Sequence, residues 1–150
     1  MADRDKAISV LQELIETCHD GHHGYRQAAE HINDPEIRAF FNEQSAERDA
    51  LANELEDVVE RLGGKPKDRG SMVGALHRAW FSAKETITKS DEAVLNSVEA
   101  GEDNAKRQYE EALRSDLPAD VISVLERQSR SVFAAHDHVR NLRDRYRRAA

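Results

Sequence analysis

The chain has 150 residues, of which 34% are charged and 5% are aromatic, with seven glycines and three prolines. Helix breakers are few and the length suffices for a core, so we expect one all-α domain over residues 1–150. The net charge of −7 argues against nucleic acid and anionic membranes as partners. The single cysteine, the charged N-terminus and the lack of a run of roughly 20 apolar residues indicate a cytoplasmic protein.

Two long amphipathic helices are predicted in the first part of the chain. The first covers about residues 3–33, because apolar side chains recur at alternating steps of three and four. Asp34 can then cap a second helix, and Pro35 suits the first turn of that helix. The second helix ends near Leu62, before Gly63-Gly64. The short loop makes these two helices antiparallel neighbours.

A connection with a helix of its own is expected between residues 65 and 90. The first seven residues have the composition of a linker, and about residues 72–88 form a shorter amphipathic helix. At about 1.5 Å per residue, such a helix spans much of the length of a bundle. A long crossover of this kind is typical of ferritin-like bundles and not of plain up-down-up-down bundles.

Two further long helices complete the prediction. The third begins after Ser90, which can cap it, and ends near Ser115, while the fourth follows Pro118 and carries an apolar stripe to Tyr146. The sequence therefore predicts an all-α, ferritin-like four-helix bundle with a short crossover helix between helices two and three. The apolar face of the crossover helix would pack on the bundle or form a dimer contact. We expect the protein to be a homodimer.

Ionisable residues interrupt two of the apolar stripes. His22 follows Gly21 in the first helix, and Glu102 follows Gly101 in the third. Burying such groups costs several kcal/mol unless they are paired, hydrogen-bonded or bound to a metal. Antiparallel pairing places His22 near residues 44–47 and Glu102 near Gln128, so we expect one polar layer at mid-height.

One interpretation of this layer is a metal centre. Carboxylates and imidazoles from facing helices are the ligands with which four-helix bundles hold iron or manganese, and zinc also accepts them. Helices two and four nevertheless lack a complete Glu-x-x-His motif, and the sequence does not identify the metal. Five residues are the candidate ligands: His22, Glu47, Glu99, Glu102 and His136.

The other interpretation is a polar network that satisfies itself and only fixes the register of the helices. Arg48 would pair with Glu102 or Glu47, and His136 would pair with Glu99. The residues alone leave both interpretations open.

Four segments carry a resemblance to a known family. They are LQELIETCHDGHHGYRQAAEHINDPEIRAFF, GALHRAW, GEDNAKRQYEEAL and ERQSRSVFAAHDHVRNLRD. In these segments the chain resembles a family of small bacterial ferritin-like four-helix-bundle proteins of unknown function. The resemblance implies a ferritin-like fold with a crossover helix and no assigned reaction. His22, Glu102 and His136 lead us to expect a role in stress or metal homeostasis. His22 and His23 stand where the family pattern leads us to expect an acidic residue, which counts against a carboxylate-rich diiron centre.

Overall fold

The computed structural model describes residues 2–67 and 90–149, which form four α-helices. They are α1 (Ala2–His31), α2 (Pro35–Arg61), α4 (Asp91–Leu113) and α5 (Ala119–Ala149). No β-strand occurs in these two ranges. The four predicted long helices are therefore confirmed, whereas the crossover helix predicted over residues 72–88 lies outside the described residues.

The helix ends follow from capping chemistry in the local sequence. The Asp34 carboxylate accepts hydrogen bonds from the backbone N–H groups of Glu36 and Ile37, at 2.9 and 3.4 Å. The Ser90 hydroxyl accepts one from the N–H of Ala93 at 3.1 Å. Gly63 follows α2 with a φ of 86°, a left-handed conformation that glycine adopts without strain. These caps satisfy backbone groups that the helix itself leaves unpaired.

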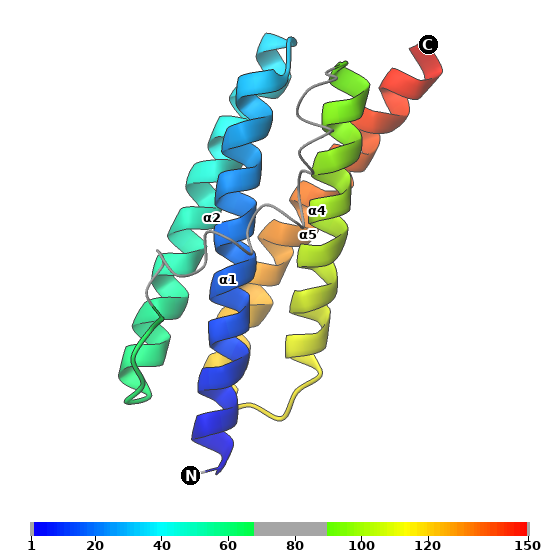
Figure 1. The fold of residues 1–150 in the computed structure, drawn as a ribbon. Coiled ribbons are helices and arrows are strands. Elements are labelled where there is room, and N and C mark those ends of the chain that lie inside the picture. The colour runs from blue at the N-terminus through cyan, green and yellow to red at the C-terminus, as the bar shows by residue number, and fades with distance from the viewer. Residues whose placement is uncertain (1, 68–89, 150) are drawn as a thin grey trace.

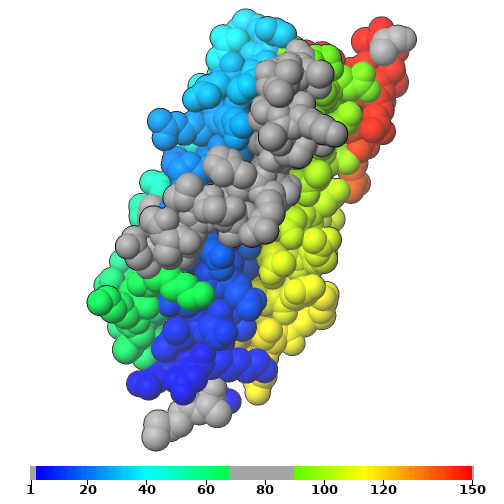
Figure 2. Space-filling model, viewed as in Figure 1, coloured from blue at the N-terminus to red at the C-terminus, as the bar shows by residue number. Residues whose placement is uncertain are grey.

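The connectivity is that of a ferritin-like bundle. Figure 1 shows α1 antiparallel to α2 and α4 antiparallel to α5, with the end of α2 and the start of α4 at opposite ends of the bundle. Helix α1 packs against both α2 and α4. In Figure 2 the C-terminal part of α5 projects at the end of the bundle where α4 begins. No helix in the described ranges is long and apolar enough to cross a membrane.

The core consists of two apolar clusters with a polar layer between them. One cluster contains buried residues between positions 11 and 18 of α1 and between 51 and 59 of α2. The other contains buried residues between positions 25 and 32, where α1 ends, and between 37 and 41 of α2. Arg48 lies on α2 between the two clusters, and Glu102 lies at the matching height on α4. Both side chains are fully buried. Ionisable groups therefore lie at mid-height of the bundle, as the interrupted stripes predicted.

Candidate functional site: a buried charge network

The centre of the bundle is an ion pair shared by three helices. Nη2 of Arg48, on α2, donates to Oε2 of Glu102, on α4, at 2.6 Å. The hydroxyl of Tyr25, on α1, donates to the same carboxylate oxygen at 2.8 Å. The Arg48 and Glu102 side chains are 1% and 0% exposed. Two strong donors thus stabilise a carboxylate that water does not reach.

Gly21 explains how an arginine fits so close to the axis of α1. A Cβ atom at this position would lie 2.8 Å from Nη1 of Arg48 and 3.1 Å from Cγ of Arg48. The missing side chain therefore makes room for the guanidinium. The same guanidinium lies over the Tyr25 ring, with 5.4 Å between its central carbon and the ring centroid, which adds a cation–π attraction.

Burial and the partner charge act in opposite directions on Arg48. Burial is the largest single effect and would lower the pKa of its guanidinium, but the Glu102 carboxylate, Tyr25 and Cys18 together outweigh burial and hold the pKa above its ordinary value. Burial, followed by the charge of Glu102, raises the pKa of Tyr25 well above its usual range. The hydroxyl of Tyr25 therefore keeps its proton and remains a donor.

Arg48 and Glu102 have polar atoms that make no hydrogen bond with the described residues. Within the described part of the chain, Nε and Nη1 of Arg48 and Oε1 of Glu102 are buried and have no hydrogen-bond partner. An unpaired buried polar atom usually costs about 1–3 kcal/mol. The second carboxylate oxygen of Glu102 can therefore accept a further hydrogen bond.

A second chain of hydrogen bonds joins all four helices on the side of the first apolar cluster. The Tyr109 hydroxyl donates to Oε1 of Gln128 at 2.8 Å and lies 3.1 Å from the sulfur of Cys18. Because that hydroxyl proton is already used, the Cys18 thiol is the donor to Tyr109. Nε2 of Gln128 donates to Glu54 at 2.7 Å, and Glu54 pairs with Arg127 at the surface. Burial raises the pKa of Cys18 to about 11, so this cysteine is a thiol and not a thiolate nucleophile.

His136, on α5, links that helix to α4 through a side-chain contact. Its ring, 1% exposed, has Nε2 at 2.7 Å from Oδ1 of Asp103 and Nδ1 at 3.1 Å from Oδ1 of Asp137. Both nitrogens can donate to these carboxylates only when both carry protons. The predicted pairing of His136 with Glu99 is wrong, because Glu99 pairs with Arg143, further toward the start of α4.

The estimate that placed His22 near residues 44–47 is confirmed, and the residue that makes the contact is Ser45. The His22 ring is half-buried, and Nδ1 lies 2.8 Å from the carbonyl oxygen of Ser45 and 3.0 Å from the hydroxyl oxygen of Ser45. Glu47 is exposed and accepts a hydrogen bond from Ser131 of α5 at 3.3 Å. Ser45 and Arg48 both face α1. The inward position of Arg48 was expected, whereas Ser45 was not singled out.

These residues do not fit a metal ion as they stand. In residues 2–67 and 90–149 no three His, Cys, Asp or Glu side chains come together as a ligand group. The carboxylate at the centre, Glu102, already holds a guanidinium, and that positive charge would repel a cation. The site formed by His22, Glu47, Glu99, Glu102 and His136 stays a prediction.

Sequence reasoning found part of this network. It placed Arg48, Glu102 and Gln128 inside the bundle and offered Arg48 as a partner of Glu102. It missed the roles of Ser45 and Asp103, which carry no signal beyond their position beside a buried stripe. Tyr25 belonged to the apolar stripe of the first helix, and only its hydroxyl indicated a polar contact.

Comparison of the structure with solved proteins finds the same architecture. A mutant of Dps1 from Mycobacterium smegmatis superimposes with a TM-score of 0.82 at 15% identity, over 95% of this chain and 97% of that chain. The dodecameric thioferritin from Bacteroides fragilis, a bacterioferritin-related protein, gives 0.81 at 15% identity, over 98% and 90%. Identities this low establish the fold alone.

Sequence comparison gives the family. Among curated proteins, no sequence matches this one. A family profile described as a domain of unknown function (DUF2383) matches residues 6–115. The chain therefore belongs to the DUF2383 family, a ferritin-like family of unknown function.

Proposed function

We propose that this protein is a non-catalytic bundle for self-association or protein interaction, in which the buried charge network fixes the register of the helices. The observation that carries the proposal is the 2.6 Å ion pair between Arg48 and Glu102, with both side chains fully buried. A buried pair is matched in only one alignment of the helices, so each shifted alignment leaves an unpaired charge in the core. Such a pair favours one packing without requiring a reaction.

Self-association is the second part of the proposal. The name of the Bacteroides fragilis protein describes a dodecamer, and the fold is shared at a TM-score of 0.81. We propose that residues 1–150 form one cytoplasmic domain that assembles at least as a homodimer. Sedimentation equilibrium over a range of protein concentrations measures this directly. A monomer at every concentration would contradict it.

Metal binding in stress or metal homeostasis is the competing function. Its support is the shared fold with proteins named Dps and thioferritin, together with the unpartnered Oε1 of Glu102 and Oε2 of Glu99. Iron, manganese and zinc are the candidate metals, because all three accept carboxylate and imidazole ligands. A metal at this place would have to draw Glu102 away from Arg48.

Metal loading separates the two functions. Protein purified without a histidine tag is incubated with ferrous iron, manganese or zinc, desalted, and analysed for metal per chain. Glu102→Gln removes the central carboxylate charge, and Glu43→Gln removes an exposed charge on α2 as a matched control. Metal content well below one ion per chain in all three proteins supports the structural role. One ion per chain that is lost only in Glu102→Gln would overturn it.

A further inference from the structure

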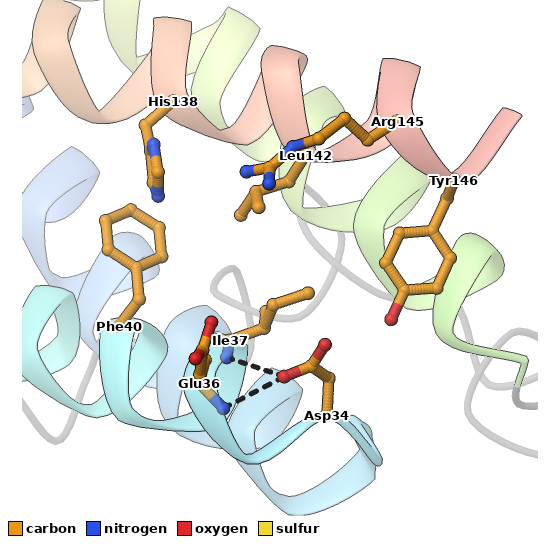
Figure 3. A pocket seen from close by; sticks show the side chains of 8 residues that line it. All are labelled: Asp34, Glu36, Ile37, Phe40, His138, Leu142, Arg145 and Tyr146. Atoms are coloured by element: carbon orange, nitrogen blue, oxygen red, sulfur yellow. Dashed lines mark hydrogen bonds between the residues drawn. The ribbon is translucent and has the colours of Figure 1, made fainter. Parts of the chain in front are cut away.

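A cavity of about 250 Å³ lies where α2 begins and α5 ends, away from the buried charge network. Figure 3 shows its lining side chains facing one another from the two helices. None of them belongs to the network of Arg48 and Glu102. The residues of α2 and its cap line one wall and those of α5 line the other: Asp34, Glu36, Ile37, Phe40, His138, Leu142, Arg145 and Tyr146.

The floor of the cavity is apolar. Ile37 and Leu142 are 5% and 7% exposed and belong to the second apolar cluster, against which Phe40 packs. The edge of the His138 ring meets the Phe40 ring, with 4.5 Å between centroids. Aromatic and aliphatic side chains of this kind form the usual body of a ligand pocket.

Arg145 supplies a positive charge at the α5 wall. Arg145 forms no ion pair with any residue in the described ranges, whereas its neighbours Arg143 and Arg147 face Glu99 and Glu92. In Figure 3 the guanidinium of Arg145 lies beside Leu142, on the same side of the cavity as His138. An unpaired guanidinium is a strong binding group for a carboxylate.

The opposite wall is acidic. The Asp34 carboxylate caps α2, and the exposed Glu36 carboxylate has no hydrogen-bond partner among the described residues. The Tyr146 hydroxyl, at the far edge, donates to Asp91 at 3.2 Å. The cavity therefore has a cation on one wall and an anion on the facing wall, next to an apolar floor.

We propose that this cavity binds a small zwitterion with an apolar body, of which a free hydrophobic α-amino acid is the simplest example. The ligand carboxylate would meet Arg145, its ammonium group would meet Glu36, and its side chain would cover Ile37, Phe40 and Leu142. The volume lies just below the roughly 300–1,000 Å³ of common ligand pockets, which suits a molecule of amino-acid size.

Titration of the full-length protein with L-phenylalanine, followed by amide NMR shifts, tests the proposal. Two matched probes each lack one charge: 3-phenylpropionate lacks the ammonium group, and phenethylamine lacks the carboxylate. Each lost charge-assisted contact should weaken binding by about tenfold or more. Saturable shifts at the amides of Phe40, His138 and Leu142 are expected for L-phenylalanine.

Variants assign the two charges. Arg145→Gln and Glu36→Gln should each weaken L-phenylalanine binding by about tenfold or more. Arg140→Gln, an exposed arginine of α5 outside the cavity, should leave binding unchanged. Circular dichroism shows whether each variant keeps its helices.

Three outcomes would overturn the proposal. The first is the absence of saturable shifts at these amides, and the second is equal binding of all three probes. The third is a change in the same amide shifts on dilution without ligand, because a second copy of the chain would then cover the cavity. None of these outcomes bears on the ion pair at the centre of the bundle, so this proposal and the proposed structural role fail separately.

Discussion

Two ion pairs in this bundle have the same chemistry and very different surroundings. Arg48 and Glu102 are 1% and 0% exposed, whereas Arg127 and Glu54 are 53% and 35% exposed. Both pairs join helices that are distant in sequence. Water can replace the partner of an exposed charge but not that of a buried one, so surface pairs contribute about 0–1 kcal/mol and breaking a buried pair costs about 3–5 kcal/mol. Burial, not the type of contact, decides which pair the fold depends on.

The largest expected effect is the loss of the central arginine. Arg48→Met removes the guanidinium and leaves the Glu102 carboxylate buried without its counter-charge. We expect the free energy of unfolding to fall by about 3–5 kcal/mol, measured by urea denaturation. Arg127→Met at the surface pair is the control and should cost about 1 kcal/mol or less. Equal losses in the two variants would contradict the difference between the two regions.

Gly21 offers a test in which the sign of the effect changes. Gly21→Ala places a methyl group 2.8 Å from Nη1 of Arg48, and overpacking of this kind costs about 1–3 kcal/mol. In an Arg48→Ala background the obstructing atoms are gone. The same Gly21→Ala change should then stabilise by up to about 1 kcal/mol, because alanine is the better helix former. A loss of equal size in both backgrounds would show that Gly21 does not make room for Arg48.

The second hydrogen-bond chain should contribute less than the ion pair. Tyr109→Phe removes the hydroxyl that joins Cys18 to Gln128, and we expect a loss of about 1–2 kcal/mol in the free energy of unfolding. Tyr146→Phe removes a hydroxyl that bonds to Asp91 at the partly exposed end of α5. It should cost less, so a larger loss for Tyr146→Phe would contradict the ranking by burial.

A further expected effect depends on pH. Burial, helped by the nearby charge of Glu16, raises the pKa of Asp20 from 3.8 to about 7. The folded state then holds a proton that the unfolded chain has lost, so stability decreases as pH rises from about 4 to about 7, and the loss is complete above that range.

Asp20→Asn should remove this dependence. The variant should gain stability over the wild type at about pH 8 and gain little at about pH 3, where Asp20 is mostly protonated in both the folded and the unfolded state. Thermal unfolding at the two pH values measures the difference. Asp57→Asn, at an exposed position of α2, is the control. A gain that is the same at both pH values would mean that Asp20 does not titrate in this range.

The sequence predicted the helices well because their signals are local. Apolar spacing, Asp34 as a cap and Gly63 at the end of α2 each act within a few residues. The inward positions of Arg48 and Glu102 followed from the same spacing.

The partners across the bundle were harder to predict. On a helix, a shift of one residue turns a side chain by about 100°, so an estimate that placed His22 near residues 44–47 did not single out Ser45 as the residue in contact. Likewise, His136 reaches Asp103, one turn beyond the expected Glu99. Contacts of this kind depend on how the two helices pack and on which way each long side chain turns.

The most direct test of the structural role is a double-mutant cycle on the central ion pair. Arg48→Met, Glu102→Leu and the double variant are compared with the wild type by their free energies of unfolding. Each single change leaves one buried charge unpaired, while the double change leaves none. If the pair is structural, each single variant loses about 3–5 kcal/mol and the double variant returns close to the wild type. Losses that simply add in the double variant would contradict a coupled, buried ion pair at the centre of this bundle.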